Sequence, residues 1–223
     1  MTDSTTNRLS GAGPAMRVEP PVAPDERVRH DRRAALSLLL IGGVCGLAWA
    51  AGLRGLMAVV AGAASTVDWT GTFVWILLPG VVTGLLLGWA EHLRRTGGRR
   101  GWRWLALAPL SFASLFVYGI GDLSEFFETG LGGGTIAIPL IGMAGGYALS
   151  GRGPIWARAA SGVIALVPVP MWALTAETIF GAEFALGTPR GAWVALFLYS
   201  FVAVLALACA IPHRPVAVPP GHS

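Results

Sequence analysis

Charged residues divide the chain into long apolar stretches and short polar connections. Six stretches of 18 to 23 residues contain no charged side chain, and a helix that crosses a bilayer needs about 20 mostly apolar residues. The pattern therefore predicts an all-α integral membrane protein with six transmembrane helices. The predicted spans are approximately 34–53, 69–91, 104–121, 132–151, 157–176 and 191–211.

Polar, proline-rich segments flank the apolar part. Residues 1–33 combine Pro, Gly, Ser and Thr with mixed charges, a composition that cannot bury enough apolar surface to offset the entropy of ordering. We therefore expect a disordered tail over 1–33, a six-span domain over 34–212 and a second tail over 213–223. Arg32-Arg33 before the first apolar run also fits a cleaved twin-arginine signal, but the five further spans favour an uncleaved helix.

The composition agrees with a membrane protein. Hydrophobic residues make up 54% of the 223 residues, charged residues only 13%, and the mean hydropathy is +0.62. Soluble domains carry about 25% charged residues. This difference argues against a soluble enzyme, a disordered protein and a nucleic-acid-binding module.

The arginines predict the orientation in the membrane. The chain has 16 Arg and no Lys, and with six spans only Arg54 and Arg190 fall on the side opposite the termini. The positive-inside rule then places both termini in the cytoplasm. Arginine without lysine is typical of GC-rich bacterial genomes, so the expected location is a bacterial plasma (inner) membrane, as a multi-pass protein.

The loop from Arg94 to Arg103 is a candidate contact for lipid. It carries five arginines, and Trp102 and Trp104 lie at its end. Basic juxtamembrane clusters attract anionic headgroups, and tryptophan prefers the headgroup level. The predicted partner is therefore anionic membrane lipid rather than nucleic acid, and simple anchoring of the topology is the alternative.

Small residues recur at a spacing of four within three predicted spans. This spacing stacks them on one helix face, where helix backbones can approach closely. The partner helix can belong to the same chain, to a second copy or to another membrane protein. The glycines concerned are Gly42, Gly46, Gly80, Gly84, Gly88, Gly142 and Gly146.

Prolines interrupt several predicted spans. Each removes a backbone donor and kinks the helix unless neighbours compensate. Breaks in the second span of each three-span half resemble the arrangement in inverted-repeat transporters, whose substrates bind at such breaks. The candidate breaks along a pathway are Pro79, Pro139, Pro168 and Pro170.

Few ionisable groups lie near the predicted spans. Glu91 and His92 at a cytoplasmic helix end suggest an interfacial gate, although pairing of Glu91 with a nearby arginine is the simpler expectation. The outer acids Asp122, Glu125 and Glu128 suggest a weak site for a divalent cation or a cationic ligand. A short interfacial helix with a hydrated acidic face is the alternative.

No pattern for catalysis is present. The sequence lacks H-E-x-x-H, P-loop and dinucleotide-binding motifs. Cys45 and Cys209 alone cannot complete a structural zinc site, so we expect no metal and no cofactor. The chain is therefore predicted to be a non-catalytic polytopic membrane protein that acts through helix packing with lipid or other membrane proteins. The alternative function is a small-solute or ion transporter or channel.

Overall fold

The computed structural model describes residues 24–112 and 131–216, and every regular element in these two segments is helical. The longer elements are α1 (Pro24–Ala61), the π-helix η2 (Trp69–Leu77), α2 (Leu78–Arg95), α5 (Leu131–Ala148), α6 (Ile155–Leu166), α7 (Pro168–Phe180) and α8 (Pro189–Cys209). Short 3-10 turns are η1 (Gly62–Ala64), η3 (Trp102–Leu107), η4 (Ala182–Phe184) and η5 (Ile211–His213). The predicted all-α class is thus confirmed for the described residues.

Four helical segments are long and apolar enough to cross a membrane. They are Val28–Ala61, Trp69–Arg95, Ile155–Phe180 and Pro189–His213. The apolar part of α5, Ile136–Ala148, is shorter than a full span. These segments contain four of the six predicted spans.

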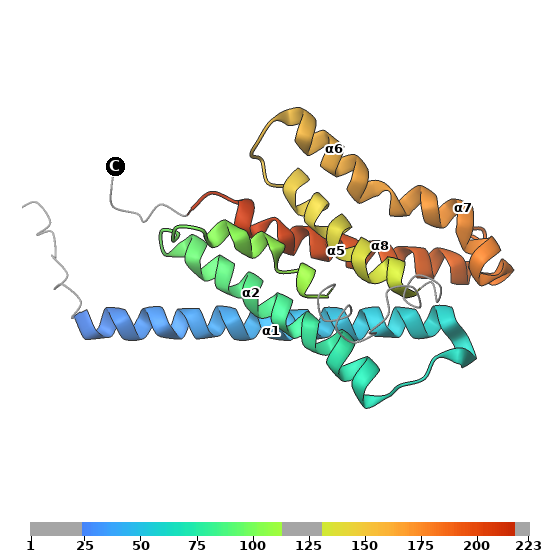
Figure 1. The fold of residues 1–223 in the computed structure, drawn as a ribbon, viewed down its shortest axis with the longest axis horizontal. Helices are drawn as coiled ribbons and strands as arrows, with labels where there is room; N and C mark the ends of the chain where they lie inside the picture. The colour runs from blue at the N-terminus through green and yellow to red at the C-terminus, as the bar shows by residue number, and fades with distance from the viewer. Residues whose placement is uncertain (1–23, 113–130, 217–223) are drawn as a thin grey trace, which may run out of the picture.

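The helices form two groups (Figure 1). α1 and α2 run side by side as one pair, and α5 packs against both α6 and α8 in the other group. The start of α1 and the ends of α2 and α8 lie at the left of Figure 1, and the start of α8 lies at the right. We call these the arginine end and the opposite end.

The first helix is much longer than predicted. α1 begins at Pro24, so residues 24–33, which were expected to be disordered, are helical. Proline is favourable at the first helical position because its missing N–H needs no partner there. The arginines that follow are good helix formers, and extending an existing helix needs no new nucleation.

The third predicted span differs from a regular helix where the structure describes it. Trp102–Leu107 forms a 3-10 turn after Gly101, which has a φ of +83°. Pro109 follows and has no N–H to donate to Leu105, while Ala108 donates to Leu105 in the i−3 pattern at 3.1 Å. Residues 113–121 of this predicted span lie outside the described residues.

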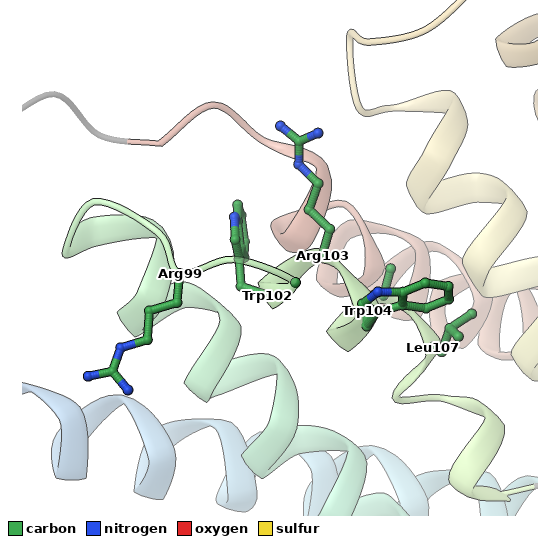
Figure 2. Close-up of a pocket in the computed structure, with 7 residues that line it drawn as sticks. Arg99, Trp102, Arg103, Trp104 and Leu107 are labelled. Atoms are coloured by element: carbon green, nitrogen blue, oxygen red, sulfur yellow. The ribbon is translucent and has the colours of Figure 1, made fainter.

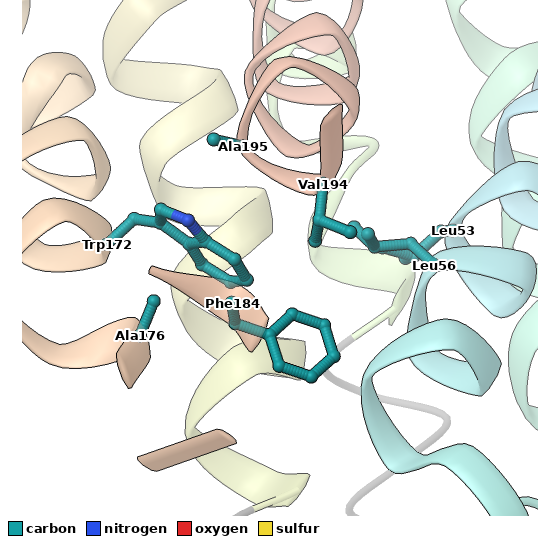
Figure 3. Close-up of a cluster of buried hydrophobic side chains, with 7 residues drawn as sticks. All are labelled: Leu53, Leu56, Trp172, Ala176, Phe184, Val194 and Ala195. Carbon is teal, nitrogen blue, oxygen red and sulfur yellow. The ribbon is translucent and has the colours of Figure 1, made fainter. Parts of the chain in front are cut away.

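An apolar core joins the two groups near the opposite end (Figure 3). Leu53 and Leu56 of α1 contact a cluster that includes Trp172, Phe184 and Val194. This core holds α8 against α1 near the opposite end.

The start of α8 is fixed by its own sequence. Thr188 accepts a hydrogen bond from the Gly191 N–H at 2.9 Å, and Pro189 follows at the first helical position.

Candidate functional site

Glycines bring α1 and α2 into backbone contact. A β-carbon at Gly84 would lie on the carbonyl oxygen of Gly42 and 3.0 Å from the Cα atom of Gly46. A β-carbon at Gly46 would likewise lie on the carbonyl oxygen of Gly80. The glycine faces of these two helices are therefore occupied by each other within one chain.

The second glycine face packs in the same way. A β-carbon at Gly142 of α5 would be 2.5 Å from Cγ of Leu205, and one at Gly146 would be 2.5 Å from Cβ of Cys209. Both partners lie on α8. Gly88 of α2 faces the backbone of α1 at Leu38.

Glu91 lies in an ion-paired cluster at the arginine end. Its Oε2 atom is 2.7 Å from Nε of Arg94, and its Oε1 atom is 2.7 Å from Nε of Arg95. The expected pairing of Glu91 with nearby arginines is confirmed. Since the Glu91 side chain is only 14% exposed, the two arginines compensate a largely desolvated carboxylate.

His92 is buried beside this cluster. Its Nε2 atom is 3.9 Å from Oδ1 of Asp31 on α1, and its ring stacks on Trp89 with centroids 5.2 Å apart. Arg94 also donates to the carbonyl oxygen of Pro215 at 3.3 Å. These contacts link α2 to α1 and to the chain after α8, so both residues proposed as a gate have a structural role.

A hollow lined by arginine and tryptophan lies next to η3 (Figure 2). Its volume is about 560 Å³, and Arg99, Trp102, Arg103 and Trp104 contribute to its wall. In Figure 2, the Arg99 and Arg103 side chains extend away from the turn in different directions. Trp102 is buried against Ala90 and Leu93, whereas Trp104 is 75% exposed.

A second hollow, the apolar cleft, lies between α1, α2 and α8. Its volume is about 330 Å³. The side chains that line it are aliphatic or aromatic with three polar or sulfur-containing exceptions, Cys45, Thr83 and Glu91. Thr83 is engaged elsewhere, since its hydroxyl is 2.8 Å from the Ser111 hydroxyl. The cleft is therefore an apolar space with one charged residue at its edge.

The prolines divide into two classes. Pro168 follows the end of α6 and begins α7, and Pro79 follows the change from π-helix to α-helix at Leu78. Pro139 lies inside α5 and does not end it, whereas Pro170 is the third residue of α7 and falls in its first turn. The Tyr199 hydroxyl of α8 donates to the carbonyl of Val169 at 3.0 Å, which joins α8 to the first turn of α7. None of these prolines lines the apolar cleft, and the transport hypothesis remains a prediction.

Arg54 donates hydrogen bonds to polar groups in and after the turn between α1 and η2. It donates to the Ser65 hydroxyl at 3.0 Å, to the Thr72 hydroxyl at 3.4 Å and to the carbonyl oxygen of Thr66. Asp68 instead accepts from the Gly71 N–H at 2.5 Å as the cap of η2. The sequence showed that Arg54 is isolated, but not which of its many polar neighbours it would bind.

Other contacts were missed because their signals are common in membrane helices. Trp49 donates its indole N–H to the carbonyl of Phe201 at 3.0 Å and joins α1 to α8. A tryptophan inside an apolar run was the only signal for this bond. The Thr83–Ser111 pair was equally hard to infer, because Ser and Thr occur throughout the predicted spans.

The predicted acidic site lies outside the described residues. Asp122, Glu125 and Glu128 fall between residues 113 and 130. Among the residues that the structure describes, no group of three or more His, Cys, Asp or Glu side chains could hold a metal ion.

Comparison of the chain with protein-family models, with curated proteins and with solved structures gave no match. The functional argument therefore rests on the geometry of the chain itself.

Proposed function

We propose that this protein is a six-span, non-catalytic protein of a bacterial plasma membrane that binds anionic lipid at its arginine end. In this arrangement both termini and the Arg94–Arg103 loop face the cytoplasm. The exposed basic surface next to η3 is the observation that carries the proposal. Arg99, Arg100 and Arg103 are all exposed there, together with Trp104.

The chemistry of this surface fits the interface of a bilayer. Arginine forks match phosphate geometry, and each Arg near an anionic surface contributes about 1 kcal/mol of attraction. Tryptophan rings favour the headgroup level. Because the glycine faces are filled within the chain, they supply no reason to prefer a protein partner over lipid.

Native mass spectrometry in mixed micelles tests this proposal. We expect purified protein to retain phosphatidylglycerol in preference to phosphatidylcholine when both are added in equal amounts. Replacing Arg99, Arg100 and Arg103 together by Gln should weaken that preference by about 1 kcal/mol per residue, and added salt should weaken it further.

Arg190→Gln is the matched control, since Arg190 is also exposed but lies in the first turn of α8, at the opposite end. It should leave the preference unchanged. Equal retention of both lipids by the wild type, or no effect of the triple substitution, would contradict the proposal.

A further inference from the structure

The apolar cleft has a closed end and a charged end. Trp49 lies at one end, where its ring meets Phe112 at 5.6 Å and Phe201 at 5.9 Å between centroids. Glu91 and Ile211 line the other end. From Trp49 to Leu38 along α1 is eleven residues, or about 16 Å at 1.5 Å per residue.

The cleft exists because α1 and α8 separate toward the arginine end. Near the opposite end they touch, since the Trp49 indole binds the Phe201 carbonyl and a β-carbon at Gly52 would meet the Phe201 ring. Beyond this contact the residues of α8 that line the cleft are Val204, Leu205 and Ala208, followed by Ile211 of η5, and none of them is aromatic. The two helices therefore enclose space instead of interdigitating.

The cleft is open to the surroundings of the helices. Ile41 is 59% exposed and Val204 is 54% exposed, and both line it. Both residues lie inside candidate membrane-spanning segments, where the surroundings are lipid tails. A flexible hydrocarbon chain can enter such a space without desolvating any polar group, because Thr83 is already hydrogen-bonded to Ser111.

The arginines at the charged end of the cleft favour a lipid with an anionic headgroup. Glu91 shares its carboxylate between Arg94 and Arg95, so the cluster carries one negative and two positive groups. The Arg95 side chain is 58% exposed, and only its Nε atom is bonded within the described part of the chain. Its remaining N–H groups are free to donate to a phosphate.

We infer that the apolar cleft holds one acyl chain of an anionic phospholipid, whose phosphate binds Arg95 beside the cleft's charged end. The volume of about 330 Å³ lies at the lower end of the range for small-ligand sites, about 300–1,000 Å³. It suits one chain rather than a whole lipid or an additional helix, whose diameter with side chains is about 10 Å. This inference rests on the proposed lipid binding and adds a defined site for one molecule.

Photocrosslinking of the full chain in nanodiscs tests the site. The probe is phosphatidylglycerol with a diazirine in the middle of one acyl chain, and the labelled positions are mapped by peptide mass spectrometry. We expect adducts to concentrate in residues 38–49 and 204–211. Ala208→Phe, which fills the cleft, should reduce these adducts about tenfold, as a loss of about 1.4 kcal/mol would.

Leu207→Phe is the matched control, because Leu207 neighbours Ala208 on α8 but is 54% exposed and does not line the cleft. It should leave the adducts unchanged. Thermal unfolding of both variants shows whether each is folded. If Ala208→Phe fails to fold, Val204→Phe replaces it, since Val204 lies at the exposed rim. Arg95→Gln should reduce labelling about fivefold, as a loss of about 1 kcal/mol would, whereas Arg190→Gln, at the opposite end, should not.

The outcomes separate this site from general lipid binding. Adducts spread evenly over the exposed faces of α6 and α7, or adducts insensitive to Ala208→Phe, would overturn the cleft site while leaving the preference for anionic lipid intact. Equal labelling by a phosphatidylcholine probe would also overturn it, because the charged end would then select nothing. Loss of the phosphatidylglycerol preference in micelles would instead contradict the proposed function.

Discussion

Gly84 has no room for a side chain, which makes it a sensitive position between α1 and α2. A β-carbon there would lie 2.8 Å from the Gly42 carbonyl carbon and even closer to its oxygen. Both neighbours are backbone atoms, so the helices would have to separate. We expect Gly84→Ala to lower the free energy of unfolding by about 1–3 kcal/mol, measured by thermal or denaturant unfolding in detergent.

Gly55 provides the control at the same scale. It is also helical, but a β-carbon there would meet nothing within 4 Å. Gly55→Ala should be neutral or stabilising by up to about 1 kcal/mol, because alanine is the better helix former. Equal destabilisation by both substitutions would show that close approach at Gly84 is not the cause.

The residue scale also shows what a spacing rule can predict. The recurrence of small residues identified Gly42, Gly46, Gly80 and Gly84 as a close-packing set, because a spacing of four defines a helix face in any sequence. It left the partner helix open, since the same face suits a neighbour in this chain or in another. Long-range bonds such as Trp49 to Phe201 depend on how whole helices meet, and no local pattern encodes that.

At the scale of elements, Trp49 contributes one hydrogen bond and its ring to the contact between α1 and α8, in addition to the apolar core and the bond from Arg190 to the Val59 carbonyl. Trp49→Phe keeps a ring in place but removes the donor to the Phe201 carbonyl, which is 3.0 Å away. We expect a loss of about 1 kcal/mol of stability, measured as a lower midpoint of unfolding. Trp156→Phe, on a side chain that is 73% exposed, should have no comparable effect, and a similar loss there would refute the assignment.

The turn between α1 and η2 should depend on the shape of the Arg54 side chain. Its guanidinium reaches Ser65, Thr66 and Thr72 at once, which a lysine ammonium cannot reproduce with the same fork. We expect Arg54→Lys to speed amide hydrogen exchange over residues 62–68 severalfold. Exchange in α8 is the internal reference. Unchanged exchange over residues 62–68 would show that the turn stays ordered without the Arg54 hydrogen bonds.

Helix ends were harder to predict than helix positions. Charge-free runs locate a helix because a buried charge is costly in lipid, but they do not say where it stops. α1 therefore extends into charged residues from Pro24, and the region around Pro109 forms a 3-10 turn where an α-helix was expected. In both cases local backbone chemistry decides the outcome, and hydropathy does not report it.

For the whole molecule, the number of spans determines which groups share a compartment. Four segments are long and apolar enough to cross a membrane, and with those alone the whole stretch from 96 to 154 would stay on the arginine side. Six spans instead place Glu125 on the opposite side, where the positive-inside rule leaves only two arginines. Both arrangements put the termini on one side, so the termini cannot distinguish them.

A single cysteine at position 125 can distinguish them. In a chain with Cys45 and Cys209 replaced by alanine, we expect a membrane-impermeant maleimide to label Glu125→Cys in intact cells. Val67→Cys, on an exposed residue after α1, is the positive control, and Arg99→Cys should react only after the membrane is opened. Protection of Glu125→Cys until lysis would contradict six spans and would place Asp122, Glu125 and Glu128 beside the basic end, where they would compete with anionic lipid for the arginines.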